Sequence, residues 1–212
     1  MYSFINQHIE LLLAELKPKK HINPYIDICR SFDRGDRLDA EFQDTYKKYF
    51  GMNAARPSER FLVKYFDLLD LSRGGRSVDV IEVTKELRNY SPAKDETAKV
   101  HLSFATKLAH MIDRTYPIFD STVSAFFYLP GANGLKGAEK KYVRHKSNYE
   151  FLRKEYRRII AESLLSPSIS CFRQKYPDAI HYTDEKIIDT LIWRFAAYLK
   201  SGALQKGSIF YS

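Results

Sequence analysis

Apolar residues recur at intervals of three and four along most of the chain, and this spacing predicts helices. Between residues 3 and 16 the apolar positions form one stripe, which consists of Phe4, Ile5, Ile9, Leu12, Leu13 and Leu16. The same spacing predicts further helices over residues 37–51, 57–73, 77–91, 98–112, 120–129, 147–165 and 183–200.

The ends of these segments carry residues that start and stop helices. Pro57 suits a first turn, and Ser77, Asp120 and Thr183 are of the type that caps a helix N-terminus. No stretch alternates between apolar and polar residues as a half-buried strand does. The sequence therefore predicts an all-α protein in which residues 1–212 form a single compact unit.

Composition narrows the class of protein. A hydrophobic content of 44% and a charged content of 28% are ordinary for a globular protein. No apolar run approaches the roughly 20 residues that cross a bilayer, and residues 1–20 lack the basic start of a signal peptide. Two cysteines, Cys29 and Cys171, cannot supply a disulfide scaffold or a four-cysteine metal site. We expect a cytoplasmic protein.

The charge of the chain indicates a polyanionic partner. The formal net charge is +8, which favours nucleic acid. Positive charge is densest in the glycine-punctuated segment 130–146, which we expect to be a loop that contacts phosphates. Its basic residues are Lys136, Lys140, Lys141, Arg144 and Lys146, against the single acid Glu139. Most of the 15 Tyr and 14 Phe should be core, as should Trp193, although a few aromatic side chains could stack on bases.

One stretch of the chain, residues 103–127, contains the candidate catalytic residues. Residues 103–112 read SFATKLAHMI, and residues 116–127 read YPIFDSTVSAFF. The first holds Lys107 inside a predicted helix, and in the second Asp120 opens the next helix. This arrangement resembles the core of the helix-hairpin-helix DNA glycosylases, and it is closest to the bacterial proteins that are similar to 8-oxoguanine DNA glycosylase.

The resemblance implies a role for each of these residues. Lys107 would be the nucleophile that attacks C1′ of the sugar, and Asp120 would be the catalytic aspartate that stabilises the developing sugar cation. His110, three residues after Lys107, would lower the pKa of that amine if it were protonated. The hairpin over residues 101–106, with Ser103, Ala105 and Thr106, would hold a DNA phosphate together with the basic segment 136–146.

The function that the resemblance implies is a DNA glycosylase with or without lyase activity. It would be a monomer that flips a damaged or modified base out of double-stranded DNA and excises it, in repair or in defence against phage DNA. The chemistry needs no metal or other cofactor. The glycosylase-like unit would be undivided, or would consist of two helical subdomains with a cleft between them.

Two features favour a second hypothesis, a helical DNA-binding module without catalysis. Ser103 and Ala105 stand where the family's hairpin has glycine, and only 120 − 107 = 13 positions separate the lysine from the aspartate, fewer than is usual in such glycosylases. A third hypothesis is a helical protein-interaction domain whose positive charge is incidental.

Overall fold

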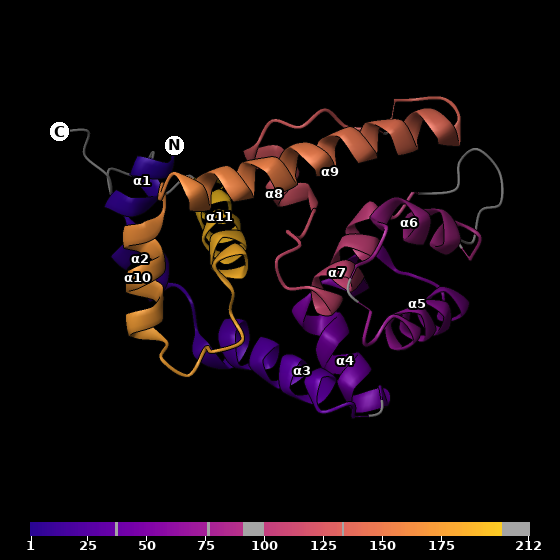
Figure 1. Ribbon diagram of the computed structural model, residues 1–212, viewed down its shortest axis with the longest axis horizontal. Helices are drawn as coiled ribbons and strands as arrows, with labels where there is room; N and C mark the ends of the chain where they lie inside the picture. The colour runs from indigo at the N-terminus through magenta and orange to yellow at the C-terminus, as the bar shows by residue number, and fades with distance from the viewer. Residues whose placement is uncertain (37, 76, 91–99, 133, 201–212) are drawn as a thin grey trace.

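The computed structural model describes residues 1–36, 38–75, 77–90, 100–132 and 134–200. The regular elements in these ranges are all helices, so the predicted all-α class is confirmed (Figure 1). The α-helices are α1 (Tyr2–Gln7), α2 (Ile9–Ala14), α3 (Asn23–Asp33), α4 (Ala40–Tyr49), α5 (Glu59–Leu71), α6 (Val80–Arg88), α7 (Leu102–Ile112), α8 (Ser121–Phe126), α9 (Ala138–Ala161), α10 (Ser166–Lys175) and α11 (Asp184–Lys200). Two short turns of other helix types, η1 (Pro18–Ile22) and η2 (Met52–Ala55), lie before α3 and after α4.

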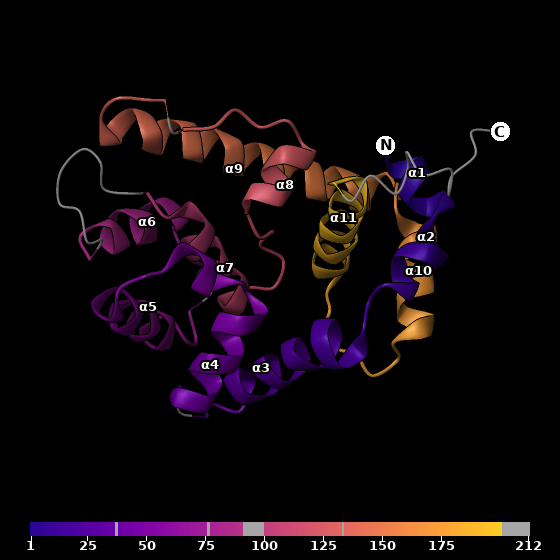
Figure 2. The same ribbon diagram turned by 180° about the vertical axis from the view of Figure 1, so that it is seen from behind.

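The helices form two groups that α9 and α3 connect. Helices α4 to α7 lie on one side of the molecule, and α1, α2, α10 and α11 lie on the other (Figures 1 and 2). The long helix α9 runs along one edge of both groups, and α3 runs along the opposite edge. Between the groups, α8 packs against α11. Within the first group, α7 packs against α5 and α6.

Helix α7 is at the centre of its group because nearly all of its side chains are apolar or small. Nine of its eleven residues are buried, from Leu102 to Met111 with the exception of Ser103. A helix that is apolar on all sides must be covered on all sides. The polar residues on it, which include Lys107 and His110, are therefore held inside the protein.

Short polar side chains cap the N-termini of α8 and α11, at the positions where the sequence predicts these helices to start. Asp120 Oδ1 accepts hydrogen bonds from the backbone N–H groups of Thr122 and Val123, both at 2.8 Å. Thr183 Oγ1 accepts one from Lys186 N at 3.2 Å. Both predicted caps are thus confirmed. Ser77 is not the cap of α6, because Asp79 Oδ1 binds the first free N–H groups of that helix.

Several predicted helix bounds are wrong. The stripe over residues 3–16 is divided at His8 into α1 and α2, and α3 and α10 were not expected. Helix α9 begins at Ala138 and not near residue 147, so most of the predicted basic loop is helical. Helix α7 begins at Leu102, so residues 102–106 are the start of a helix and not a hairpin. The predicted helix ends within 91–99 lie outside the described residues.

A pair of hydrogen bonds connects α7 to the segment that leads into α8. Phe119 N donates to Thr106 Oγ1 at 3.1 Å, and the hydroxyl can donate to the carbonyl of Ser103 or of Phe119, at 3.2 and 3.4 Å. Thr106 is fully buried. No water can therefore replace the hydroxyl at this position.

We predict that Thr106→Val lowers the free energy of unfolding by about 1–3 kcal/mol, because the buried N–H of Phe119 would lose its partner. Urea unfolding measures the change. Thr84→Val is the matched control. Thr84 is equally buried, but its hydroxyl bonds only to the Val80 carbonyl within the same helix, so this variant should cost less than about 1 kcal/mol. Equal losses for both variants would contradict the assignment.

Candidate active site

A cavity of about 600 Å³ lies between the two helix groups, a size in the range of small-ligand sites. Its wall is built from segments far apart in the sequence: residues around Leu16 and His21, the α4–η2 corner at 49–55, the start of α7, residues 118–124, the loop 130–132, and parts of α9 and α11. Both Lys107 and Asp120 are on this wall. The structure therefore brings together the two residues that the sequence singled out.

Lys107 is in a surrounding that favours the neutral amine. Its side chain is buried, and Nζ lies 5.5 Å from the centre of the Phe104 ring. Burial lowers the pKa of Lys107 to about 8. The carboxylates of Asp120 and Asp189 act against this shift, and the ammonium group of Lys186 adds to it. A substantial fraction of this amine is therefore unprotonated at mildly alkaline pH.

Asp120 is fixed by its position at the start of α8. Both cap hydrogen bonds use Oδ1, and they hold the carboxylate at the cavity wall. Asp120 therefore both caps the N-terminus of α8 and lines the cavity. Asp120 faces the same space as Lys107 and contributes a Coulomb interaction to it.

A second lysine–aspartate pair, which the sequence did not indicate, also lines the cavity. Lys186 Nζ lies 2.8 Å from Asp189 Oδ2 on α11, and both residues are buried. The ammonium group also lies over two aromatic rings, 5.2 Å from the centre of Tyr25 and 5.4 Å from that of Tyr49. Burial raises the pKa of Asp189, and the Lys186 ammonium acts against that shift.

Asp189 has an unused hydrogen-bonding atom. Its Oδ1 is buried and has no hydrogen-bond partner among the described residues. Buried carboxylate oxygens are normally satisfied, so this atom is available to a donor that enters the cavity. The only signal in the sequence was the spacing of three between Lys186 and Asp189 on the predicted helix over residues 183–200.

Trp193 also lines the cavity, so the prediction that it belongs to the core is wrong. It is 38% exposed, and it follows Asp189 by one helical turn. Its indole lies 6.4 Å from the imidazole of His21, ring centre to ring centre. A large flat side chain and an unsatisfied carboxylate oxygen therefore share one wall.

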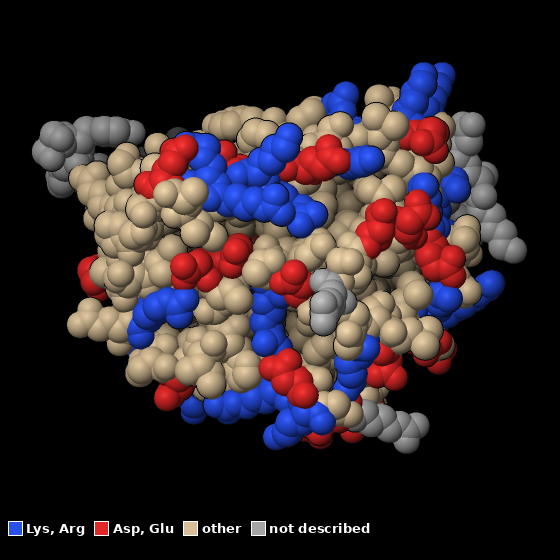
Figure 3. Space-filling model, in the orientation of Figure 1, with Lys and Arg blue, Asp and Glu red and all other residues tan. Residues whose placement is uncertain are grey.

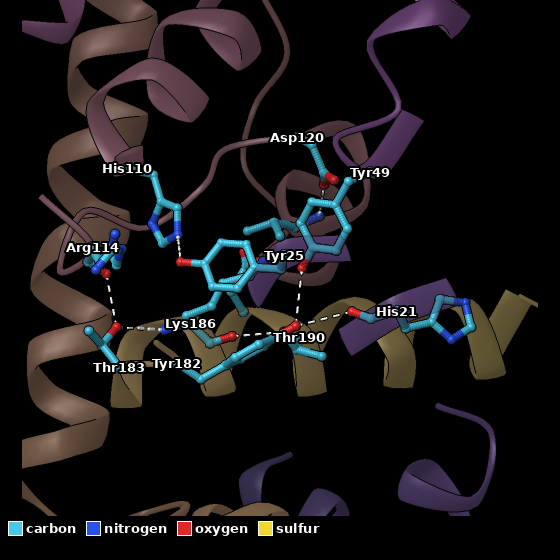
Figure 4. A network of polar contacts seen from close by, with 12 residues as sticks. His21, Tyr25, Tyr49, His110, Arg114, Asp120, Tyr182, Thr183, Lys186 and Thr190 are labelled. Atoms are coloured by element: carbon cyan, nitrogen blue, oxygen red, sulfur yellow. Dashed lines mark hydrogen bonds and ion pairs between the residues drawn. The ribbon is translucent and has the colours of Figure 1, made fainter. Parts of the chain in front are cut away.

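His110 cannot have the role that its spacing from Lys107 along the helix suggested. Since the Tyr116 carbonyl can only accept, His110 Nδ1 donates to it at 2.8 Å, and Nε2 pairs with the Tyr25 hydroxyl at 2.8 Å (Figure 4). Burial, reinforced by Lys186, lowers the pKa of His110 to about 3. The imidazole is neutral at physiological pH, and the cation that lowers the pKa of Lys107 is Lys186 instead.

The predicted phosphate-binding residues fall into two groups. Ser103 lines the cavity, whereas Ala105 and Thr106 are fully buried within α7 and cannot touch a phosphate. The basic residues of 136–146 lie on or just before the first turns of α9. Of these, Lys136, Lys140 and Lys146 are exposed, and Lys141 and Arg144 are partly exposed. Along the edge of the molecule where α9 runs, basic side chains lie among acidic ones (Figure 3).

The described residues contain no group of three or more His, Cys, Asp or Glu side chains that could hold a metal ion. Within the same residues, no helix is both long enough and apolar enough to cross a membrane. Compared with protein-family models, curated proteins and solved structures, the chain matches none of them. The case for a function therefore depends on the residues of the cavity.

We predict that Asp120→Asn lowers the pKa of Lys107 further, because the variant removes a carboxylate that raises it. Asparagine caps helices about as well as aspartate, so the fold should be retained. A pH titration of the lysine ε-methylene signals by NMR measures the shift. Asp79→Asn is the control, since Asp79 caps α6 with the same geometry and does not line the cavity. An unchanged titration in Asp120→Asn would contradict the geometry.

Proposed function

We propose that the protein is a DNA glycosylase that uses Lys107 as its nucleophile and Asp120 as its electrostatic catalyst. The observation that carries this proposal is the meeting of these two residues on one cavity, in surroundings that bring the pKa of the lysine to about 8. A surface lysine and a simple helix cap would have no reason to face the same enclosed space. The substrate would be DNA that carries a damaged or modified base.

The arrangement supports a stepwise reaction. The bond between the base and C1′ breaks, and its electron pair leaves with the base, so positive charge develops on the sugar. Asp120 stabilises this charge, and the neutral amine of Lys107 forms the new bond to C1′. The attacking nitrogen then loses a proton, and the departing base gains one. Ring opening gives a Schiff base between Lys107 and the sugar, from which β-elimination would nick the strand.

The part of the cavity wall that α11 supplies suits the base. Trp193 offers a flat face for stacking, and Asp189 Oδ1 offers a free acceptor to an N–H group of the base. An extruded nucleotide is usually held by stacking and by hydrogen bonds to its polar edge. The volume of about 600 Å³ is sufficient for a base with its sugar. Lys186 fixes Asp189 in place through their ion pair.

The phosphates would be held by the basic residues that begin α9. Lys136, Lys140 and Lys146 extend into solvent, and His145 and Asn148 of the same helix line the cavity. A strand that contacts this end of α9 would therefore pass close to the cavity. In this proposal, α6 and α7 would form the helix pair of a glycosylase-like core, since they pack against each other.

Borohydride trapping tests the nucleophile. We predict that the protein forms a covalent adduct with abasic-site DNA in the presence of borohydride, and that Lys107→Gln forms none. Asp120→Asn should form the adduct about 100-fold more slowly, which is typical for loss of one stabilising group. Lys175→Gln is the control, because Lys175 is exposed on α10 and does not line the cavity.

Two outcomes would count against catalysis by this pair. An adduct that persists in Lys107→Gln would assign the chemistry to another amine. Binding to DNA with neither trapping nor base release from any modified oligonucleotide would leave the non-catalytic binding module as the better description.

The pH dependence of trapping follows from the lowered pKa of Lys107. Only the neutral amine attacks, and its pKa of about 8 means that the ammonium form dominates below that pH. We therefore predict that the trapping rate rises about tenfold per pH unit up to pH 8 and levels off above it. Lys186→Met removes a nearby cation and should move the midpoint to higher pH. A midpoint near 10.5 in the wild-type protein would mean that Lys107 is not the attacking group.

A further inference from the structure

Exposed aromatic side chains gather around the cavity. In the part of the chain that the structure describes, three aromatic residues are more than a third exposed: Tyr128 at 85%, Phe151 at 45% and Trp193 at 38%. Trp193 is on the cavity wall. Tyr128 precedes the wall residue Pro130 by two positions, so their Cα atoms lie within about 7 Å. Phe151 follows the wall residue Asn148 by one helical turn.

Tyr128 is held in a backbone conformation that normally belongs to glycine. Its φ is +52°, and it ends α8 in a turn where Leu129 N bonds to Ser124 O and Tyr128 N bonds to Ala125 O. This turn has a left-handed residue at the position of Tyr128, where glycine carries no steric penalty. The tyrosine ring buries almost nothing within the described protein. Folding alone therefore does not account for a tyrosine here.

Phe151 is close to the same turn and is preceded along α9 by positively charged residues. Its ring centre lies 6.2 Å from that of Phe127, the residue before Tyr128. Asn148 Nδ2 donates to the Pro130 carbonyl at 2.9 Å, which holds the 130–132 loop against α9. Lys140 and Arg144 precede Phe151 by eleven and seven residues, a spacing that places all three on one side of the helix.

We propose that Tyr128 and Phe151 form a stacking platform for unpaired bases next to the flipped nucleotide, so that the preferred substrate is single-stranded DNA. This inference rests on the proposed function for the identity of the central nucleotide. Exposed rings bordered by Lys140 and Arg144 are the combination that binds single strands, because rings stack on bases of any sequence while cations contact the backbone. In a continuous duplex the faces of the bases are already covered by their neighbours.

The test compares the binding of an unmodified single-stranded oligonucleotide with that of the same sequence as a duplex, by fluorescence anisotropy. The wild-type protein should bind the single strand more tightly. Tyr128→Gly and Phe151→Ala should each weaken single-strand binding about tenfold, the equivalent of about 1.4 kcal/mol, and leave duplex binding nearly unchanged. Leu71→Ala is the control, since Leu71 is 81% exposed on α5 and does not line the cavity.

Tyr128→Gly also separates a binding role from a structural one. Because glycine relieves the left-handed strain, this variant should unfold at a higher urea concentration than the wild type while it binds the single strand more weakly. A variant that is both destabilised and weaker in binding would overturn the platform. So would equal binding losses in Leu71→Ala, tighter binding to the duplex, or no binding to either form.

The platform and the glycosylase chemistry can fail separately. The binding experiment uses unmodified DNA and involves no reaction, whereas trapping on abasic-site DNA depends on Lys107. Normal trapping with unchanged binding in Tyr128→Gly would overturn the platform alone. Weakened single-strand binding in Tyr128→Gly without any trapping would support the platform and overturn the chemistry.

Discussion

The hydrogen bonds between Thr106 and Phe119 determine the geometry of the site. Lys107 directly follows Thr106 in the chain, and Asp120 directly follows Phe119. The contact between these two neighbours, in which Phe119 N donates to Thr106 Oγ1, therefore sets the relative positions of the two functional candidates. It also allows the short separation of thirteen positions, because α7 ends at Ile112 and the chain returns along it without a further helix before Asp120. The segment 113–120 thereby brings Asp120 to the cavity and to the start of α8, and it leads into the helix that packs against α11.

The sequence predicted the parts of the site that follow from local chemistry. The helical class came from apolar spacing, and the caps at Asp120 and Thr183 came from side chains that bind free N–H groups within three residues. The start of α9 was predicted too late because glycine and lysine suggested a loop. The first residues of α9, Ala138 to Lys141, are in fact good helix formers, and Tyr142, Asn148 and Tyr149 on the same helix are buried against the rest of the fold.

The missed residues depend on contacts between distant parts of the chain. Lys186 and Asp189 belong to the site because of their interactions with other segments: Lys186 lies over the rings of Tyr25 and Tyr49, and both residues act on the pKa of Lys107. No pattern within α11 indicates these interactions. His110 was assigned a charge from its distance to Lys107 along the helix. Its true partners, Tyr25 and the Tyr116 carbonyl, are supplied by two other segments, and burial keeps it neutral. Trp193 was placed in the core because it belongs to an apolar stripe of the predicted helix. Such a stripe does not show whether it faces packed side chains or a cavity.

Four of the five Lys and Asp side chains on the cavity wall lie close enough to interact with one another, and the fifth, Lys20, is exposed to solvent. When both lysines are protonated and both aspartates ionised, the charges of Lys107, Asp120, Lys186 and Asp189 cancel. Loss of the proton from Lys107 leaves these four side chains with one net negative charge, and three of them are buried, where Coulomb interactions are stronger than in water. The step that turns the amine into a nucleophile therefore also makes the cavity attractive to a cation. In a reaction whose transition state is a positively charged sugar, activation of the attacking group and stabilisation of the charge would occur in the same event.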